Sequence, residues 1–171
     1  PAGPLEKKAR TLVWGACGLG VLLAGYASCI EPFWLEVTHV EVRTSKLPAG
    51  HPGIRIVHIS DLHSDQKVRL EKRLPDVVAA ERPDIIVFTG DTINQRKALP
   101  IFKECLRRIS AVAPTFAVRG NWDMWQWRNL DVFGGTGAIE LRHKVTEIQI
   151  RGVTVRIACL LYTSDAADAF D

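Results

Sequence analysis

The sequence predicts an α/β fold, and three observations support that prediction. Strand-like and helix-like segments alternate over residues 54–120, in the order strand, helix, strand, helix, strand. Residues 84–90 (DIIVFTG) form a nearly continuous apolar run, which is typical of a strand covered on both faces. The connecting links are short, so we expect a right-handed βαβαβ unit around a parallel sheet. A length of 171 residues and a hydrophobic content of 47% suit one globular domain.

The N-terminal region predicts a membrane segment. Residues 11–30 carry no charge and follow a basic tip, residues 1–10, that contains Lys7, Lys8 and Arg10. About 20 apolar residues suffice to cross the hydrocarbon core. The glycines in this run disfavour the alternative, a buried helix of a soluble protein. We therefore expect a single-pass transmembrane helix, with the basic tip in the cytoplasm and everything downstream exported.

Two short patterns bear on whether this segment is cleaved. The tripeptide GYA (25–27) is a passable site for a signal peptidase. The sequence YASC, which ends at Cys29, is a poor lipidation box because Tyr26 stands where an aliphatic residue is usual. We expect an uncleaved anchor.

Residues 31–53 are expected to contain a first strand and a connector. Residues 35–42 (LEVTHVEV) alternate apolar and polar side chains, as a half-buried strand does. Residues 46–53 (KLPAGHPG) are rich in turn-forming residues. This connector leads into the main domain, which we expect over residues 54–158.

The elements of the main domain follow from periodicity. Strands are predicted at 54–60, 84–90 and 115–120. Residues 144–158 predict a hairpin that turns at Arg151-Gly152. The first helix carries Leu70, Leu74, Val77 and Val78 on one face with Pro75 in its first turn, and the second carries Phe102, Leu106 and Ile109.

Each of the three central strands ends in a polar motif: SDLH (60–63), TGD (89–91) and RGNWD (119–123). Parallel strands bring their carboxyl ends to one edge of a sheet, so we expect these motifs to be neighbours. Each residue alone has an ordinary explanation as a cap, turn or loop residue. Together, two carboxylates, an imidazole and an amide oxygen form a ligand set suited to Mn, Fe or Zn. The residues concerned are Asp61, His63, Asp91 and Asn121.

The ordered motifs DLH, GD and GNWD resemble those of the calcineurin-like metallophosphoesterase superfamily. The segment IEPFWLEVTHVEV, followed by IRIVHISDLH, further resembles its membrane-associated bacterial branch, the YaeI-type phosphodiesterases. The resemblance spans about Ile30 to Ala158. It implies a metallophosphoesterase-type β-sandwich flanked by helices, here a βαβαβ core plus a hairpin, preceded by the transmembrane helix.

The resemblance also implies a chemistry. Such an enzyme hydrolyses phosphodiester or pyrophosphate bonds with a hydroxide held by two divalent metal ions, here Mn, Fe or Zn. Carried over by motif, Asp61 and His63 would bind the first metal, Asp91 would bridge both, and Asn121 would bind the second. Asp123 would bind no metal itself and would support the residues that do.

Two departures from the family pattern limit what the resemblance implies. The family usually has a histidine after the asparagine, where this chain has Trp122, so no catalytic acid is assigned. The family's later histidine motifs have no counterpart, and His143 does not match them.

Residues 159–168 (CLLYTSDAAD) resemble the translated read-through of a sequencing adapter. We therefore expect residues 159–171 to be a non-native tail, the domain to be truncated, and the chain to be inactive or nearly so.

The substrate class is suggested by position and composition. The membrane segment and the aromatic run at 124–127 (MWQW) favour a lipid-linked or nucleotide phosphoester, although these aromatics have the alternative of packing in the core. The chain has no basic stripe interleaved with aromatics, so no nucleic acid partner is expected. The spacing of the four cysteines supports neither a disulfide scaffold nor a zinc site.

Two other functions are compatible with an α/β domain behind a membrane segment. The first is a non-catalytic, membrane-tethered binding module, which bound metal in the full-length protein would argue against. The second is a nucleotide-binding Rossmann-type domain. The sequence disfavours it because no glycine-rich loop follows the first central strand at Ser60.

Overall fold

The computed structural model describes residues 3–142 and 144–159, and the chain divides into two compact units, Pro1–His39 and Val40–Asp171. His143 and residues 160–171, which include most of the expected non-native tail, lie outside the described residues. The elements are α1 (Pro4–Cys29), η1 (Glu31–Phe33), β1 (Ile56–Ile59), α2 (Leu74–Ala80), β2 (Ile85–Phe88), η2 (Arg96–Ala98), α3 (Leu99–Ser110), β3 (Thr115–Ala117), α4 (Asn121–Gln126), β4 (Ile139–Glu140), β5 (Val145–Ile150) and β6 (Val153–Ala158).

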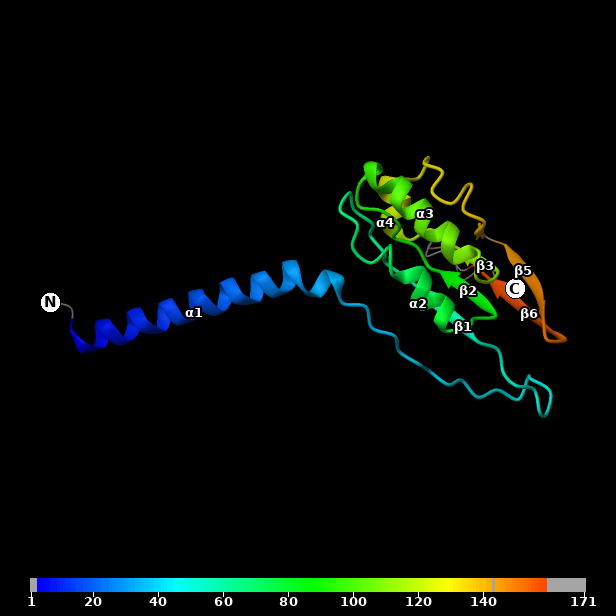
Figure 1. The fold of residues 1–171 in the computed structure, drawn as a ribbon, viewed down its shortest axis with the longest axis horizontal. Helices are drawn as coiled ribbons and strands as arrows, with labels where there is room; N and C mark the ends of the chain where they lie inside the picture. Colours follow the sequence, from blue (N-terminus) through cyan, green and yellow to red (C-terminus); the bar gives the residue numbers. More distant parts are fainter. Residues whose placement is uncertain (1–2, 143, 160–171) are drawn as a thin grey trace, which may run out of the picture. The chain divides into compact units, whose positions relative to one another are not determined.

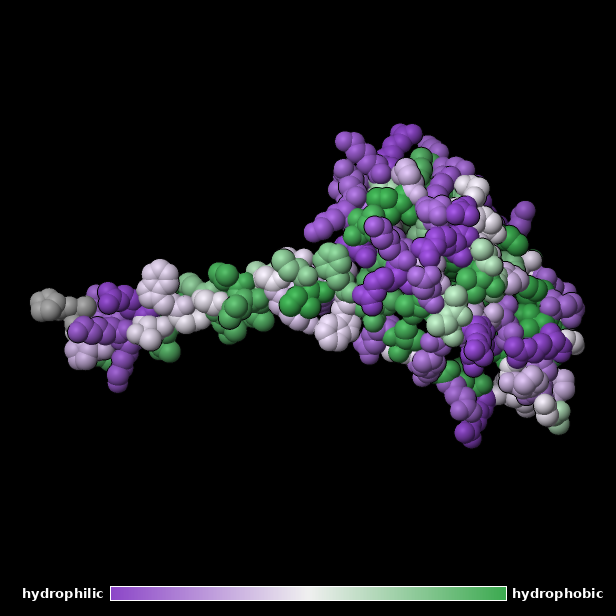
Figure 2. All heavy atoms as spheres, viewed as in Figure 1, coloured by the Kyte–Doolittle hydropathy of each residue, from purple (hydrophilic) through white to green (hydrophobic). Residues whose placement is uncertain are grey.

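Helix α1 dominates the N-terminal unit. None of its 26 residues is buried, and the segment Pro4–Phe33 is long and apolar enough to cross a membrane. At a rise of 1.5 Å per residue the helix is about 39 Å long, more than the roughly 30 Å of a hydrocarbon core. Hydrophobic residues cover most of it, and hydrophilic ones gather at its N-terminal tip (Figure 2). These features fit the expected membrane anchor, and the helix extends into the basic tip.

The second unit is built on a parallel sheet with the strand order β1-β2-β3-β4. Ile56 pairs with Ile85, Val87 with Phe116, and Phe116 with Ile139. The three central strands and their parallel pairing confirm the predicted βαβαβ unit (Figure 1). Strand β4 was not predicted, because two residues are too few to carry a periodic signal.

Helices α2 and α3 cover one face of this sheet (Figure 1). Phe88 of β2 meets Phe102 of α3 at a ring-centroid distance of 5.5 Å, and both rings contact Phe133. The residues expected on the apolar face of α3 are all buried, and Pro75 lies in the first turn of α2 as predicted. Leu70 instead precedes α2, where its carbonyl oxygen accepts the Leu74 N–H at 2.9 Å.

The β5–β6 hairpin packs on the other face of the sheet. Ile150 of β5 belongs to one buried cluster with Ile85, Phe116 and Leu141. Arg151 and Gly152 form the predicted two-residue turn, and both have positive φ, 49° and 81°, as a type I′ turn requires. The sheet is therefore enclosed between helices and a hairpin, which confirms the mixed α/β class.

The strand predicted at residues 35–42 is wrong. The structure assigns no helix or strand to this segment, and Val40 and Val42 are more than 80% exposed. Alternation of apolar residues defines a face, but a strand also needs a neighbour to bond its N–H and C=O groups. Within the described residues no strand pairs with this segment.

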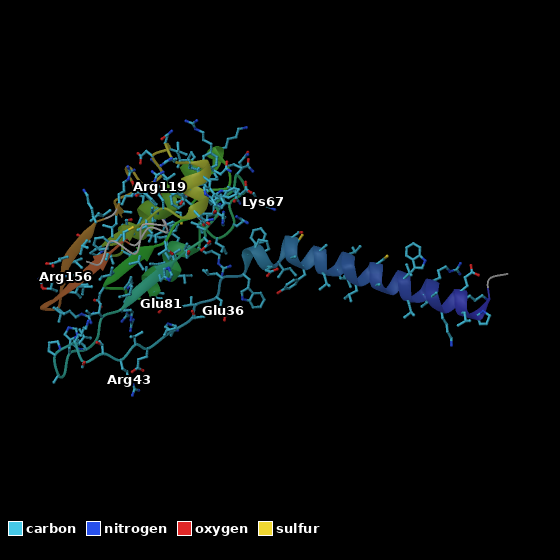
Figure 3. The ribbon with its side chains drawn as sticks, turned by 180° about the vertical axis from the view of Figure 1, so that it is seen from behind. Glu36, Arg43, Lys67, Glu81, Arg119 and Arg156 are labelled. Carbon is cyan, nitrogen blue, oxygen red and sulfur yellow. The ribbon has the colours of Figure 1, made fainter. Side chains whose placement is uncertain are left out.

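A buried arginine holds together the end of β3, β4 and the loop after α4. The Arg119 side chain is only 7% exposed, and its Nε donates to Glu140 Oε1 at 2.7 Å. Its two terminal nitrogens donate to the carbonyl oxygens of Trp127 and Leu130, each at 2.9 Å. Arg119 is labelled in Figure 3. Arg119 thereby fixes the segment that follows the GNWD motif.

Replacing Arg119 by alanine is expected to lower the free energy of unfolding by about 3 kcal/mol, because several buried acceptors lose their donor. Arg156→Ala is the matched control. Its ion pair with Glu147 lies on the hairpin surface, with side chains 76% and 50% exposed, and is expected to contribute less than about 1 kcal/mol. Urea unfolding of the detergent-solubilised chain measures both values. Equal losses would contradict a special role for Arg119.

The same network predicts an acid-sensitive stability. Burial raises the pKa of Glu140, but the hydrogen bonds from Arg142 and Arg119 outweigh it and hold this pKa below its ordinary value of 4.5. A lowered folded-state pKa gives stability that is present above pH 4.5 and is lost as the pH falls through the folded pKa. The Tm difference between the native chain and Glu140→Gln should therefore shrink between pH 6 and pH 3. Glu104→Gln, at an exposed pair with Arg107, should show a smaller trend.

Candidate metal centre

The loops after β1 and β2 continue side by side beyond the ends of their strands. The Asp61 N–H donates to the Gly90 carbonyl at 3.1 Å, and the His63 N–H donates to the Asp91 carbonyl at 2.9 Å. Ser64 then forms a parallel bridge with Ile93. The DLH and TGD motifs are therefore in register, because the pairing of the two strands extends into both loops.

This register brings three of the four expected ligands together. One ligand atom from each of Asp61, His63 and Asp91 lies within 4.8 Å of the other two. His63 Nε2 lies 3.5 Å from Asp91 Oδ2. Asp91 is buried, His63 is half-buried and Asp61 is exposed, so the cluster opens to solvent on one side. Two carboxylates and an imidazole form a donor set that suits a divalent transition metal.

The backbone at these three residues is strained. Asp61, His63 and Asp91 have φ values of 54°, 43° and 54°, in the left-handed region that non-glycine residues avoid. They are three of the five non-glycine residues with positive φ in the described part of the chain. Such strain costs about 1–3 kcal/mol per residue and gathers at functional sites.

Asn94 determines the tautomer of His63. Its Nδ2 donates to the His63 carbonyl at 3.1 Å, which leaves Oδ1 as an acceptor 2.9 Å from His63 Nδ1. The proton of a neutral His63 ring therefore lies on Nδ1, and the Nε2 lone pair faces Asp91. A metal-binding histidine is commonly oriented by an outer hydrogen bond of this kind. Asn94 is not among the predicted site residues, because nothing in its spacing distinguishes it from a turn residue.

The third motif approaches the cluster through two glycines. A Cβ at Gly90 would overlap the Gly120 backbone, and a Cβ at Gly120 would overlap the Asp91 carboxylate. The Trp122 N–H, in the first turn of α4, donates to Asp91 Oδ1 at 3.0 Å. Asn121 is the exposed first residue of α4, directly between Gly120 and Trp122. The backbone of the fourth expected ligand is therefore adjacent to Asp91.

Asp123 ties α4 to the TGD loop. Its carboxylate is fully buried, and Oδ1 accepts both the N–H and the hydroxyl of Thr92, at 2.9 and 2.6 Å. Oδ2 accepts the Gly120 N–H at 3.1 Å. These bonds agree with the expected supporting role, since Asp123 contacts the residues that flank the cluster.

Trp122 has a structural role at the position where a histidine was expected. Its indole Nε1 donates to the Ile93 carbonyl at 3.1 Å, and its ring meets His63 edge to face at a centroid distance of 6.0 Å. Trp127 donates to the same carbonyl at 2.9 Å. The indole N–H of Trp122 is thus held in a hydrogen bond and does not ionise, so this side chain cannot act as a general acid.

Comparison with known proteins agrees with this geometry. The profile of the calcineurin-like phosphoesterase family matches residues 54–157. An uncharacterized metallophosphoesterase of Aquifex aeolicus is 34% identical over 138 residues, which are 76% of this chain and 51% of that protein. The uncharacterized metallophosphoesterase YkuE of Bacillus subtilis is 32% identical over 124 residues, 65% of this chain and 42% of that protein.

A further relative carries a named activity. The UDP-2,3-diacylglucosamine pyrophosphatase LpxG of Chlamydia muridarum is 34% identical over 118 residues, 67% of this chain and 36% of that protein. The chain spans about half or less of the length of these relatives. The family match nevertheless covers more than half of the chain and includes all three polar motifs. The chain belongs to the calcineurin-like phosphoesterase family.

Proposed function

We propose that the full-length protein is a metal-dependent phosphohydrolase in which Asp61, His63, Asp91 and Asn121 hold two divalent ions. The proposal rests above all on the cluster of Asp61, His63 and Asp91 at the carboxyl edge of the parallel sheet. The strained backbone at the same three residues supports it independently. Mn, Fe and Zn suit this mixture of oxygen and nitrogen donors.

The donor groups fit such ions. Divalent cations, when bound, supply Lewis acidity and lower the pKa of a water molecule. Asp91 Oδ2 faces His63, and Oδ1 accepts the backbone N–H of Trp122, the residue after Asn121, so Asp91 lies between the other candidate ligands and would hold both ions. The Asn121 carboxamide would offer its oxygen to one ion and keep its NH₂ group for an oxygen of the substrate phosphate.

The tryptophan at position 122 bears on which bond is cleaved, unless water or another part of the full-length protein protonates the leaving group. Trp122 cannot protonate a leaving group, which favours a substrate whose leaving group needs little protonation. A pyrophosphate bond meets this condition, since its leaving group is itself a phosphate. The LpxG relative is named for such a bond in a lipid-linked nucleotide. We therefore propose a nucleotide-linked, lipid-bearing pyrophosphate as the substrate class.

Helix α1 would hold the enzyme at a membrane that contains such a substrate. The basic tip ahead of the apolar run favours an orientation with Lys7, Lys8 and Arg10 in the cytoplasm and the metal centre on the exported side. The four ligands proposed among the described residues are fewer than two ions require. We expect this chain alone to hydrolyse phosphoesters weakly or not at all.

Asp91→Asn in the full-length protein is expected to reduce Mn²⁺-dependent hydrolysis of a chromogenic phosphodiester at least about 100-fold, because it weakens the ligand shared by both ions. Asp131→Asn is the control, since Asp131 pairs with Lys103 on the surface with its side chain 68% exposed. Metal analysis of the purified protein accompanies the assay. Absence of bound transition metal together with full function of Asp91→Asn would favour a non-catalytic binding module.

Asn94→Leu is expected to weaken Mn²⁺ binding by about 10–100-fold, because the His63 ring loses the acceptor that orients it. Asn94→Asp keeps an acceptor for Nδ1–H and should retain most of the affinity. The Mn²⁺ affinity of both variants is measured by titration with Mn²⁺, with the free ion detected by electron paramagnetic resonance. Gln149→Leu, which removes a hydrogen bond to Thr154 in the hairpin, is the control. Equal affinity in the native chain and all three variants would contradict the role of Asn94 in orienting His63.

A further inference from the structure

A groove of about 450 Å³ is lined by Arg96 and by residues 125–130. Its walls come from η2, which follows the TGD loop, and from the end of α4 with the loop after it. This volume is in the range of sites that bind small organic ligands. The groove is not part of the ligand cluster, so its chemistry needs a separate explanation.

The two tryptophans of the groove differ in what their rings can do. The Trp127 indole has a structural role, since its N–H donates to the Ile93 carbonyl. The Trp125 side chain has no such bond among the described residues and is 73% exposed. A large exposed ring at the mouth of a groove is available to stack on a planar group.

The charged and polar lining points to a phosphate. Arg96 and Arg128 are the charged side chains of the groove, and neither has an ion-pair partner among the residues that the structure describes. Guanidinium groups bind phosphate through two parallel hydrogen bonds. Gln126 and Asn129 add amide groups that can both donate and accept hydrogen bonds, as the edge of a nucleobase requires.

The groove and the third polar motif share helix α4. Trp125 lies four residues after Asn121 in α4, a rise of about 6 Å. Trp127 and Trp122 share the Ile93 carbonyl, and the Trp122 backbone N–H contacts Asp91. The groove and the ligand cluster are therefore connected through α4 and the Ile93 carbonyl.

We infer that this groove binds a nucleoside monophosphate unit of the substrate, with the base stacked on Trp125 and a phosphate held by Arg96 and Arg128. The inference rests on the proposed function for the bond that joins this unit to the rest of the substrate. It assigns Trp125, Arg96 and Arg128 as specificity residues that lie outside the metal centre.

Binding of UMP and of AMP to the 171-residue chain in neutral detergent micelles, measured by calorimetry, tests the inference. EDTA is present, so that no metal at the cluster contributes to phosphate binding. We expect at least one of the two nucleotides to bind. Uridine or adenosine, and ribose 5-phosphate, should bind at least about tenfold more weakly, because each lacks one of the two recognised groups.

Trp125→Ala and the double variant Arg96→Gln/Arg128→Gln should each weaken nucleotide binding at least about tenfold. Arg73→Gln, at an exposed arginine that does not line the groove, is the control and should bind as the native chain does. Tryptophan fluorescence with and without UMP provides a second readout, because quenching should disappear in Trp125→Ala.

Absence of binding by both nucleotides, or equal binding by the groove variants, would overturn the inference. A response of Trp125 fluorescence to micelles doped with anionic phospholipid, without any response to nucleotide, would also overturn it in favour of a lipid-facing surface. Hydrolysis by the full-length protein is measured separately with a small chromogenic diester. Loss of nucleotide binding with hydrolysis intact would refute the groove alone, and absence of metal-dependent hydrolysis would refute the proposed function.

Discussion

The close contact between the backbones of Gly90 and Gly120 is the constraint on which the candidate metal centre depends. It allows the Trp122 N–H to reach Asp91 Oδ1 and sets the first residue of α4 beside the DLH and TGD loops. A side chain at either glycine would push the third motif away from the other two. The parallel register of β1 and β2 supplies the rest, since it aligns Asp61 and His63 with Asp91.

Buried polar groups hold this contact in place. Asp123 is fully buried and accepts three hydrogen bonds, while Arg119 donates to Glu140 and to carbonyls of the loop after α4. Burying a charged side chain costs free energy unless its polar atoms are hydrogen-bonded. Asp123 and Arg119 each make several such hydrogen bonds. They allow a helix of only six residues to present Asn121 and Trp122 in a fixed orientation.

The aromatic residues of the GNWDMWQW stretch divide into two functional groups. Trp122 and Trp127 donate to one carbonyl, that of Ile93, and thereby fasten α4 to the loop after Asp91. Trp125 remains exposed and lines the same groove as Arg96 and Arg128, for which the described residues provide no ion-pair partner. The position that carries a histidine in the family pattern thus serves the fold here, and the groove proposed to bind a nucleotide lies at the end of the same helix.

The sequence by itself determined the βαβαβ order, the hairpin turn at Arg151-Gly152 and the convergence of the three polar motifs, because periodicity and parallel topology are encoded locally. Only the tertiary structure decided which segments find a partner. Residues 35–42 alternate like a strand yet pair with none in the described chain, whereas the two residues of β4 pair with β3. Asn94 orients His63, and Trp125 differs from Trp127, only through contacts between residues distant in the chain, which no local pattern records.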